Sequence, residues 1–323
     1  MTIRPVLALR ASVRSKLRDL FDGSGFIEVD TPILSTEILP EAYIDPISIP
    51  MKGTRESSIF LQTSPEAFMK RLLAAGSGPV YQFARSFRDG ERGRLHDVEF
   101  VLLEWYAPKT TIDNTTEFLA KLCTATVGTK GIERVTCTEA FQKFAGVNPS
   151  TASLDELRHA GSKLELQIPE SYDRTPQNEL HYQNLWDHWF EAILSEAVQP
   201  KLGLQKPTIL EAWPASQSAF ARLDDEDSRV AKRFELFLDG VELANGWEEE
   251  TRLEIISSRI HRANEIRSAD GRDPLPQPLH FLNAHNGTMP HGVGVALGFD
   301  RLVMLTAQAN SIDSVVPFPS AYR

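Results

Sequence analysis

The sequence contains few cysteines and no long apolar stretch, and both scarcities limit what the chain can be. Its two cysteines, Cys123 and Cys137, do not stand in a spacing that holds a metal, so we expect them to be reduced and structural. No apolar run approaches the roughly 20 residues that a membrane span requires. Residues 1–20 lack the long apolar core and small-residue cleavage site of a secretory signal. These features predict a cytoplasmic protein without a membrane segment.

Basic residues are also in the minority. The chain has 34 Lys and Arg against 44 Asp and Glu, which gives a formal net charge of −10. Proteins that bind nucleic acid over a broad surface usually carry a basic face, because phosphate neutralisation supplies most of the non-specific affinity. The acidic balance therefore argues mildly against a tRNA partner, while leaving room for a local basic patch. Hydrophobic content of 41% and charged content of 24% are ordinary for a globular chain.

The spacing of apolar residues predicts strands and hairpins towards both ends of the chain, with helices between and around them. Helices are expected over 6–21, 65–73 (with Ser64 as N-cap), 181–194 and 249–269. Strands are expected over 27–34, 208–212, 233–241 and 242–247, and a hairpin over 44–49 and 59–62. The middle, about 110–205, is mostly helical in pattern. This arrangement predicts an α+β fold with a mostly antiparallel sheet flanked by helices.

Two segments carry residues suited to phosphate. Between Phe87 and Tyr106 the chain reads FRDGERGRLHDVEFVLLEWY, a hairpin whose loop is rich in cations: Arg88, Arg92, Arg94 and His96. Arginine's planar fork binds phosphate bidentately, so such a loop can hold a polyphosphate. The segment 292–305 reads GVGVALGFDRLVML, a glycine-rich strand that runs into an apolar helix with an arginine at the junction.

These segments resemble motifs 2 and 3 of class II aminoacyl-tRNA synthetases of the lysyl type, and Gly23–Leu34 is similar to motif 1. The resemblance implies the class II aminoacyl-tRNA synthetase catalytic fold as one domain over 1–323, matched less well over 110–205. It also implies a homodimer joined through motif 1. Lysyl-tRNA synthetases carry an anticodon-binding domain before motif 1, and residues 1–22 leave no room for one. We therefore expect a free-standing catalytic core.

For ATP, the resemblance implies that Arg88 and Arg301 bind the α- and γ-phosphates and stabilise the charge that builds on them. It places adenine on Phe100 and implies further nucleotide contacts from His96, Asp97, Glu242, Leu243 and Gly298. Glu235 and Glu242, in RFELFLDGVELANGWEE, match the family's metal-binding acids. Carboxylate oxygens suit Mg²⁺, which typically takes only one or two carboxylates beside the substrate phosphates.

Lysine is the implied amino acid. A lysyl ammonium that leaves water needs anionic partners, since each charge-assisted hydrogen bond contributes only about 1.5–3 kcal/mol. The positions that match the family's lysine pocket are Ser64, Glu66, Glu104, Tyr106 and Glu249, and Asn245 would hold the substrate carboxylate. Any of these acids, taken alone, could equally be an ordinary surface acid.

Among lysyl-type cores, the segments 63–82, 214–217 and 240–246 look like those of the elongation factor P–lysine lysyltransferase family. Ala296 stands where lysyl-tRNA synthetases usually have glycine, and one methyl group in a pocket is worth roughly 1–3 kcal/mol of discrimination. The resemblance implies (R)-β-lysine in preference to α-lysine, and a lysine ε-amine of elongation factor P as acceptor.

Two positions depart from the family's pattern. The acid that usually follows two residues after Arg88 is Gly90 here, with Glu91 beside it, and the family's His-Asn-Pro-Glu-Phe reads HDVEF at 96–100. These departures leave two alternatives open. One is an amino-acid-activating paralogue with a tRNA or small-molecule acceptor. The other is a binding module that has lost turnover, against which the intact Arg88, Glu235, Glu242 and Arg301 argue.

Overall fold

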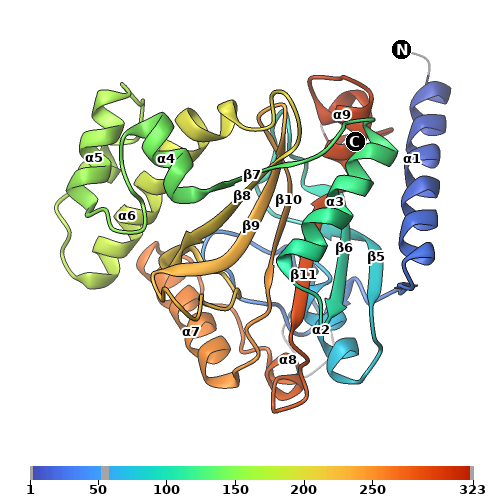
Figure 1. Cartoon of the computed structure of the whole chain (residues 1–323). Helices are drawn as coiled ribbons and strands as arrows, with labels where there is room; N and C mark the ends of the chain where they lie inside the picture. Colours follow the sequence, from blue (N-terminus) through green and yellow to red (C-terminus); the bar gives the residue numbers. More distant parts are fainter. Residues whose placement is uncertain (1–2, 52–57, 321–323) are drawn as a thin grey trace. The chain divides into compact units, whose positions relative to one another are not determined.

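A computed structural model describes residues 3–51 and 58–320 of the chain (Figure 1). The chain divides into two compact units. Unit 1 comprises residues 1–128 and 251–323, and unit 2 is the continuous segment 129–250 between them. The expectation that 1–323 forms one domain stays a prediction.

Unit 1 contains both ends of the chain. Its helices are α1 (Ile3–Gly23), α2 (Glu66–Ala74), α3 (Ile112–Thr126), α7 (Leu253–Ala269), α8 (Leu279–Ala284), α9 (Phe299–Thr306) and the 3₁₀ turn η5 (Ile312–Ser314). Its strands are β1 (Ile27–Glu28), β2 (Leu34–Ser35), β3 (Ser48–Pro50), β4 (Ser58–Leu61), β5 (Val80–Phe87), β6 (Glu99–Pro108) and β11 (Gly292–Gly298). The expected hairpin is present as the antiparallel pair β3–β4, and the connection 52–57 lies outside the described residues.

The main sheet of unit 1 is mostly antiparallel. Strand β6 pairs antiparallel with β5 on one side and with β11 on the other, and the short β1 pairs parallel with β5. Side chains alternate between the two faces of such strands. Tyr81 lies opposite Trp105, and their neighbours Gln82 and Glu104 also lie opposite each other, so these two pairs point to opposite faces of the sheet.

Helix α1 covers the aromatic face of this sheet, as Figure 1 shows for the blue helix beside β5. Val6, Val13, Leu17 and Phe21 are buried at helical spacing. The Phe21 ring stacks on Tyr81 with a centroid distance of 4.5 Å and meets the Trp105 ring edge-on at 5.3 Å. This aromatic cluster fixes the hairpin β5–β6 on α1.

Several boundaries differ from those expected, and three of them concern the candidate motifs. The strand expected over 27–34 is reduced to β1 and β2, since Pro32 between them has no N–H to donate. Helix α2 begins at Glu66 with Pro65 in the N-cap position, so Ser64 is not its N-cap. Helix α7 begins at Leu253 rather than 249, because Glu249 and Glu250 still bond to the 220–221 backbone of unit 2.

Unit 2 combines mostly antiparallel strands with a group of helices. Its strands are β7 (Glu133–Thr136), β8 (Thr208–Pro214), β9 (Val230–Leu238) and β10 (Val241–Glu248). Its helical elements are α4 (Cys137–Ala145), α5 (Leu154–Lys163), η1 (Glu170–Asp173), α6 (Glu179–Ile193), η2 (Leu194–Val198), η3 (Gln199–Lys201) and η4 (Ala215–Gln217). Strands β8, β9 and β10 are antiparallel neighbours, and β7 pairs parallel with β8.

Helices α4, α5 and α6 of unit 2 bury one aromatic-rich core. Phe141 of α4 stacks on Phe190 of α6 at 4.8 Å, and Trp213 of β8 meets Phe190 edge-on at 5.8 Å. Helices α4 and α5 begin with capping boxes, at Thr136 and Ser153. In these the hydroxyl accepts an amide hydrogen while a glutamate three residues later accepts from the capping residue.

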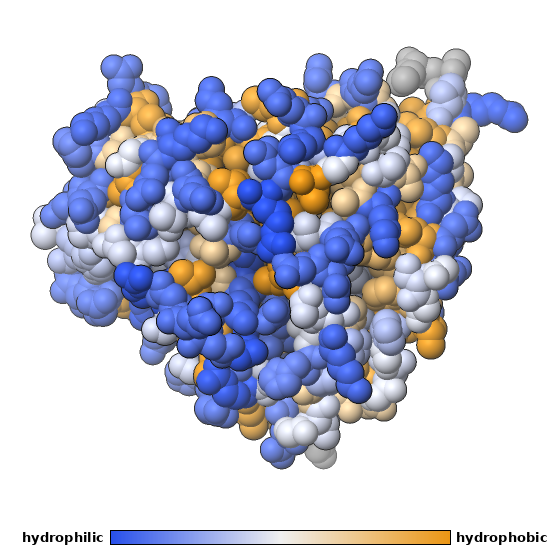
Figure 2. All heavy atoms as spheres, in the orientation of Figure 1, coloured by the Kyte–Doolittle hydropathy of each residue, from blue (hydrophilic) through white to orange (hydrophobic). Residues whose placement is uncertain are grey.

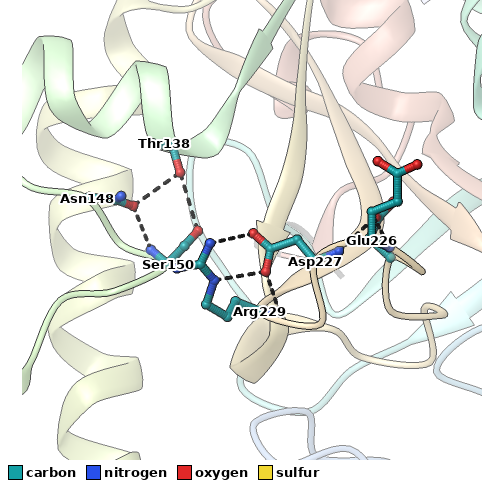
Figure 3. A network of polar contacts seen from close by, with 7 residues as sticks. Thr138, Asn148, Ser150, Glu226, Asp227 and Arg229 are labelled. Carbon is teal, nitrogen blue, oxygen red and sulfur yellow. Dashed lines mark hydrogen bonds and ion pairs between the residues drawn. The ribbon is translucent and has the colours of Figure 1, made fainter.

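Polar contacts fix the turns at the edge of unit 2 (Figure 3). Asn148 accepts at Oδ1 from the Ser150 amide at 3.0 Å and from the Thr138 hydroxyl at 3.2 Å, which ties α4 to the following loop. Arg229 donates two hydrogen bonds to Asp227, at 2.8 and 2.7 Å, in the turn before β9.

The visible face of the molecule is mostly hydrophilic, with hydrophobic residues scattered over it (Figure 2). Across the part of the chain that the structure describes, no helix combines the length and the apolar character that crossing a bilayer would require. Both cysteines are buried and unbonded to each other, and burial raises the pKa of both thiols.

The aromatic cluster around Phe21 yields a stability prediction. We expect Phe21→Ala to lower the free energy of unfolding by about 3–5 kcal/mol, because it leaves a cavity among fully buried rings. Leu7→Ala, on the exposed side of the same helix, should change it by no more than about 0.5 kcal/mol. Urea titration followed by tryptophan fluorescence measures both, and equal losses would contradict the packing described.

Candidate active site

Arg88 stands where β5 ends and the cation-rich loop begins. Its backbone amide donates to the Val98 carbonyl at 3.0 Å, and its guanidinium lies over the Phe100 ring, 5.1 Å from the centroid. The Glu91 carboxylate lies 3.6 Å from Nη1, and the buried Nε has no hydrogen-bond partner among the described residues. Arg88 and Phe100 are thus brought together, and the Arg88 side chain keeps 25% of its surface exposed, where an anion could reach it.

Arg301 lies in the first turn of α9, directly after the glycine that ends β11. Its Nε donates to the Leu95 carbonyl at 3.2 Å, and its Nη2 lies 2.6 Å from Nε2 of His96. A guanidinium can only donate, so Nε2 of His96 is the acceptor. Gly298 keeps this junction open, since a Cβ there would lie 3.4 Å from Cδ of Arg301. The structure therefore brings together Arg301, His96 and Gly298.

The other two arginines of the loop contact the C-terminal segment. Arg92 pairs with Asp313 at 2.8 Å, and Arg94 donates to the Asn310 carbonyl at 3.0 Å. Asp97 accepts at one carboxylate oxygen from the Val98 amide and at the other from the Ser320 amide. These contacts fasten the loop to the C-terminal segment, and Gly90, with φ of +73°, makes its turn.

A row of cross-strand neighbours on β5, β6 and β11 forms the polar part of the sheet in unit 1. Glu104 lies between Gln82 and Ala296, and Tyr106 lies opposite Gly294 in the next row. The Tyr106 hydroxyl donates to Oε1 of Glu104 at 2.6 Å, and both side chains are almost fully buried. The sheet register thus places three of the expected substrate residues side by side: Glu104, Tyr106 and Ala296.

Ser64 and Glu66 lie at the start of α2. The Glu66 amide hydrogen bonds to the Ser64 hydroxyl at 3.4 Å. One turn further, Lys70 is fully buried and its ammonium lies 2.6 Å from Oε1 of Glu66. Lys70 was not among the residues expected at the site from the sequence. Its i,i+4 spacing from Glu66 is a sequence feature that could have predicted this ion pair.

A further acid near these residues was also missed. Glu41 lies in the segment before β3, where no motif marks it. Burial raises its pKa to about 7, a shift that the positive charge of Arg88 opposes and that the negative charges of Glu66 and Glu91 increase. Glu41 therefore belongs to the same charged group as Arg88 and Glu66.

In unit 2, the two expected metal-binding acids lie on the hairpin β9–β10. Glu235 lies opposite Asn245, whereas Glu242 lies opposite Phe237, with a shift of register between Glu242 and Ala244. Such a shift can turn a side chain towards a site that regular pairing would not reach. Leu243, at the shift, is buried.

Arg233, which the sequence analysis did not single out, organises this hairpin. Its guanidinium lies 4.0 Å from the centre of the Trp213 ring, 2.5 Å from Oε1 of Glu235, and 3.2 Å from Oδ1 of Asn245. The arginine thereby holds one expected metal ligand and one expected substrate contact. Glu249, at the far end of the hairpin, is buried and accepts from the Trp247 indole at 3.1 Å.

The donor set of this hairpin fits a hard divalent cation. Burial raises the pKa of the Glu235 carboxyl far above its usual range; Arg233 opposes this shift and the Glu242 carboxylate adds to it. A bound cation would favour the ionised form of both acids. Within residues 3–51 and 58–320, no cluster of three or more His, Cys, Asp or Glu is placed to hold a metal. Mg²⁺ does not need one, since it usually takes one or two carboxylates and completes its shell with water and phosphate.

Comparisons with known proteins agree with this geometry. The model of the family described as tRNA synthetases class II (D, K and N) matches residues 2–322. A protein of Salmonella arizonae named elongation factor P–(R)-β-lysine ligase is 36% identical over 317 residues, which cover 97% of this chain and 94% of the relative. A protein of Proteus mirabilis with the same name is 36% identical over 320 residues, covering 98% and 95%. The chain therefore belongs to the class II tRNA synthetase family of the D, K and N types.

Proposed function

We propose that this chain is an ATP-dependent ligase that activates lysine or (R)-β-lysine and transfers it to a lysine ε-amine of elongation factor P. The observation that carries the proposal is the row of Glu104, Tyr106 and Ala296, in which the acid and the phenol are buried, and which suits a cationic amino acid. The name borne by both relatives, which match nearly the whole chain, supports the acceptor and the β-isomer.

Activation requires ATP held with its phosphate charge neutralised. The proposal assigns the α-phosphate to Arg88 and the γ-phosphate to Arg301, with adenine on Phe100 and further nucleotide contacts from His96, Asp97, Leu243 and Gly298. Positioning and electrostatic stabilisation are what such arginines supply as charge moves to the phosphoryl oxygens. The exposed part of the Arg88 side chain, at the start of the cation-rich loop, supports this assignment.

Magnesium is assigned to Glu235 and Glu242 of unit 2. Their oxygens suit this ion, and its positive charge would offset the charge that accumulates on the leaving pyrophosphate. The hydrogen bond from Arg233 fixes the direction of the Glu235 carboxylate.

The residues assigned to the amino acid are those that the family resemblance implies. They are Ser64, Glu66, Glu104, Tyr106 and Glu249, with Asn245 for the substrate carboxylate and Ala296 selecting the isomer. Outside water an unpaired charge is strongly disfavoured. The acids therefore compensate the charge of the ammonium groups once these leave water.

The reaction has two steps. A carboxylate oxygen of the amino acid attacks the α-phosphorus, the bond to the β-phosphate oxygen breaks, and pyrophosphate leaves. The ε-amine of elongation factor P then attacks the acyl carbon, an amide forms, AMP leaves, and the amine gives up a proton.

We place this reaction in the cytoplasm, where the acceptor works in translation, and we do not expect tRNA to be a substrate. We also propose a homodimer formed through the motif 1 segment. Three large hydrophobic residues of this segment are 41–58% exposed: Ile27, Ile33 and Leu34. Exposed apolar side chains gathered in one segment are typical of an interaction surface.

Amino-acid-dependent ATP–pyrophosphate exchange tests the proposal directly. We expect exchange with lysine isomers, strongest with (R)-β-lysine, and weak or no exchange with other amino acids. Radiolabelled β-lysine should then be transferred to elongation factor P, and tRNA should not accept it. A folded protein that exchanges with no amino acid would favour the binding-module alternative, and transfer to another acceptor would favour the paralogue.

The phosphate assignment predicts the behaviour of Arg301→Ala. We expect exchange to fall at least about 10²-fold, because a positioned donor to the transition-state charge is lost. Arg262→Ala, an arginine of α7 paired only at the surface with Glu265, serves as control and should keep its activity. Circular dichroism and thermal unfolding establish that both variants fold. Near-normal exchange by folded Arg301→Ala would remove its assignment to phosphate.

The isomer assignment predicts the behaviour of Ala296→Gly. Because Ala296 lies beside Glu104 in the sheet, removal of its methyl group should enlarge the space next to that acid. We expect kcat/KM for α-lysine relative to β-lysine to rise about 10-fold, within the range that one methyl group provides. An unchanged ratio would contradict the assignment of isomer choice to Ala296.

A further inference from the structure

The ion pair between Lys70 and Glu66 is unusual for its burial. The Lys70 side chain has no exposed surface, and its ammonium lies 2.6 Å from Oε1 of Glu66. Removing an ammonium and a carboxylate from water is so unfavourable that buried pairs often stabilise a fold no better than apolar residues of the same size. The stability of the fold by itself therefore does not explain why a buried lysine pairs with Glu66 at this position.

A buried hydrophobic cluster lies next to Lys70 and consists of Met69, Leu73, Val80, Tyr106 and Met289, so a methionine could replace the lysine stem. The ammonium lies 5.9 Å from the centre of the Tyr106 ring, and Tyr106 in turn donates to Glu104. Lys70 thus pairs with Glu66 and lies near the tyrosine that supports Glu104.

Glu66 is held by one carboxylate oxygen only. Oε1 accepts from Lys70, whereas Oε2 forms no hydrogen bond within the described residues. The Glu66 side chain keeps 11% of its surface exposed while that of Lys70 keeps none. One oxygen is therefore fixed from inside the protein, and the carboxylate retains an accessible side.

We propose that Lys70 is a positioning residue of the amino-acid site, which fixes the Glu66 carboxylate so that its open oxygen can bind a substrate ammonium. The inference rests on the proposed function and deepens it.

Other titratable groups act on Glu66 as well. His285, at the end of α8, is buried. Burial is the main cause that lowers the pKa of its imidazole, so the ring is neutral near pH 7. Its Nδ1 lies 2.9 Å from the Phe281 carbonyl, and Nε2 has no hydrogen-bond partner in the described part of the chain. Glu41, whose pKa burial raises to about 7, contributes negative charge only as the pH rises. The ammonium of Lys70 is therefore the cation nearest to Glu66 in this group.

The variant Lys70→Met separates positioning from packing. It keeps the unbranched stem and removes the ammonium that fixes the Glu66 carboxylate. We expect KM for β-lysine in the exchange reaction to rise at least 10-fold. KM for ATP and kcat at saturating β-lysine should stay within about threefold of the wild type.

Arg71→Met is the matched control, since Arg71 is the next residue of α2 and lies over the Phe68 ring at the partly exposed surface. It should leave KM for β-lysine unchanged. An equal rise in KM for ATP in Lys70→Met, or a large fall in kcat at saturating β-lysine, would show a structural role and overturn the proposal.

A double-mutant cycle keeps the proposal testable if Lys70→Met folds poorly. Glu66→Gln leaves Lys70 without its carboxylate, and Glu66→Gln combined with Lys70→Met removes both charges, so the double variant should be the more stable of these two. If Lys70 acts through Glu66, adding Lys70→Met to Glu66→Gln leaves KM for β-lysine unchanged within about twofold. A further rise of 10-fold would mean that Lys70 acts independently of Glu66.

The wild type, measured in parallel, separates the two hypotheses. Absence of exchange with every lysine isomer would reject the proposed function. Normal wild-type exchange, together with an additive cycle, would reject the role of Lys70 alone.

Discussion

The alternation of side chains across the hairpin β5–β6 is the constraint on which unit 1 depends. One face of the hairpin carries Tyr81 and Trp105, whose rings pack on Phe21 of α1. The other face carries Gln82 and Glu104, directly opposite each other. Because successive residues of a strand point to opposite faces, anchoring the aromatic face also fixes the position of the acids. The packing core and the candidate site are thus two sides of one element.

Charged groups in the candidate site are matched with partners inside their own unit. Glu66 pairs with Lys70, Glu104 accepts from Tyr106, and Glu235 accepts from Arg233. In a region of low dielectric an unpaired charge is strongly disfavoured, so acids that are to receive a cationic substrate need support beforehand. These partners also restrict the rotamers of the acids. Substrate binding then meets side chains that are already oriented.

Local patterns predicted the elements where one periodicity dominates. The helix expected over 6–21 is present as α1, and the glycine-rich strand and the helix that follows it are β11 and α9. Predictions were less accurate where a single residue ended an element, as at Pro32 and at the start of α2. The strand is interrupted around Pro32, and Pro65 rather than Ser64 takes the N-cap position of α2.

We could predict from the sequence the family, the order of the motifs and the residue types that suit phosphate, metal and ammonium. This was possible because spacing along a strand or around a helix turn is a local property. Only the tertiary structure decided how the cations are used. Arg92 and Arg94 bind the C-terminal segment, more than 200 residues away in the chain, while Arg301 meets His96. It also revealed Lys70 as the internal partner of Glu66, since burial depends on contacts between segments and no local pattern encodes them.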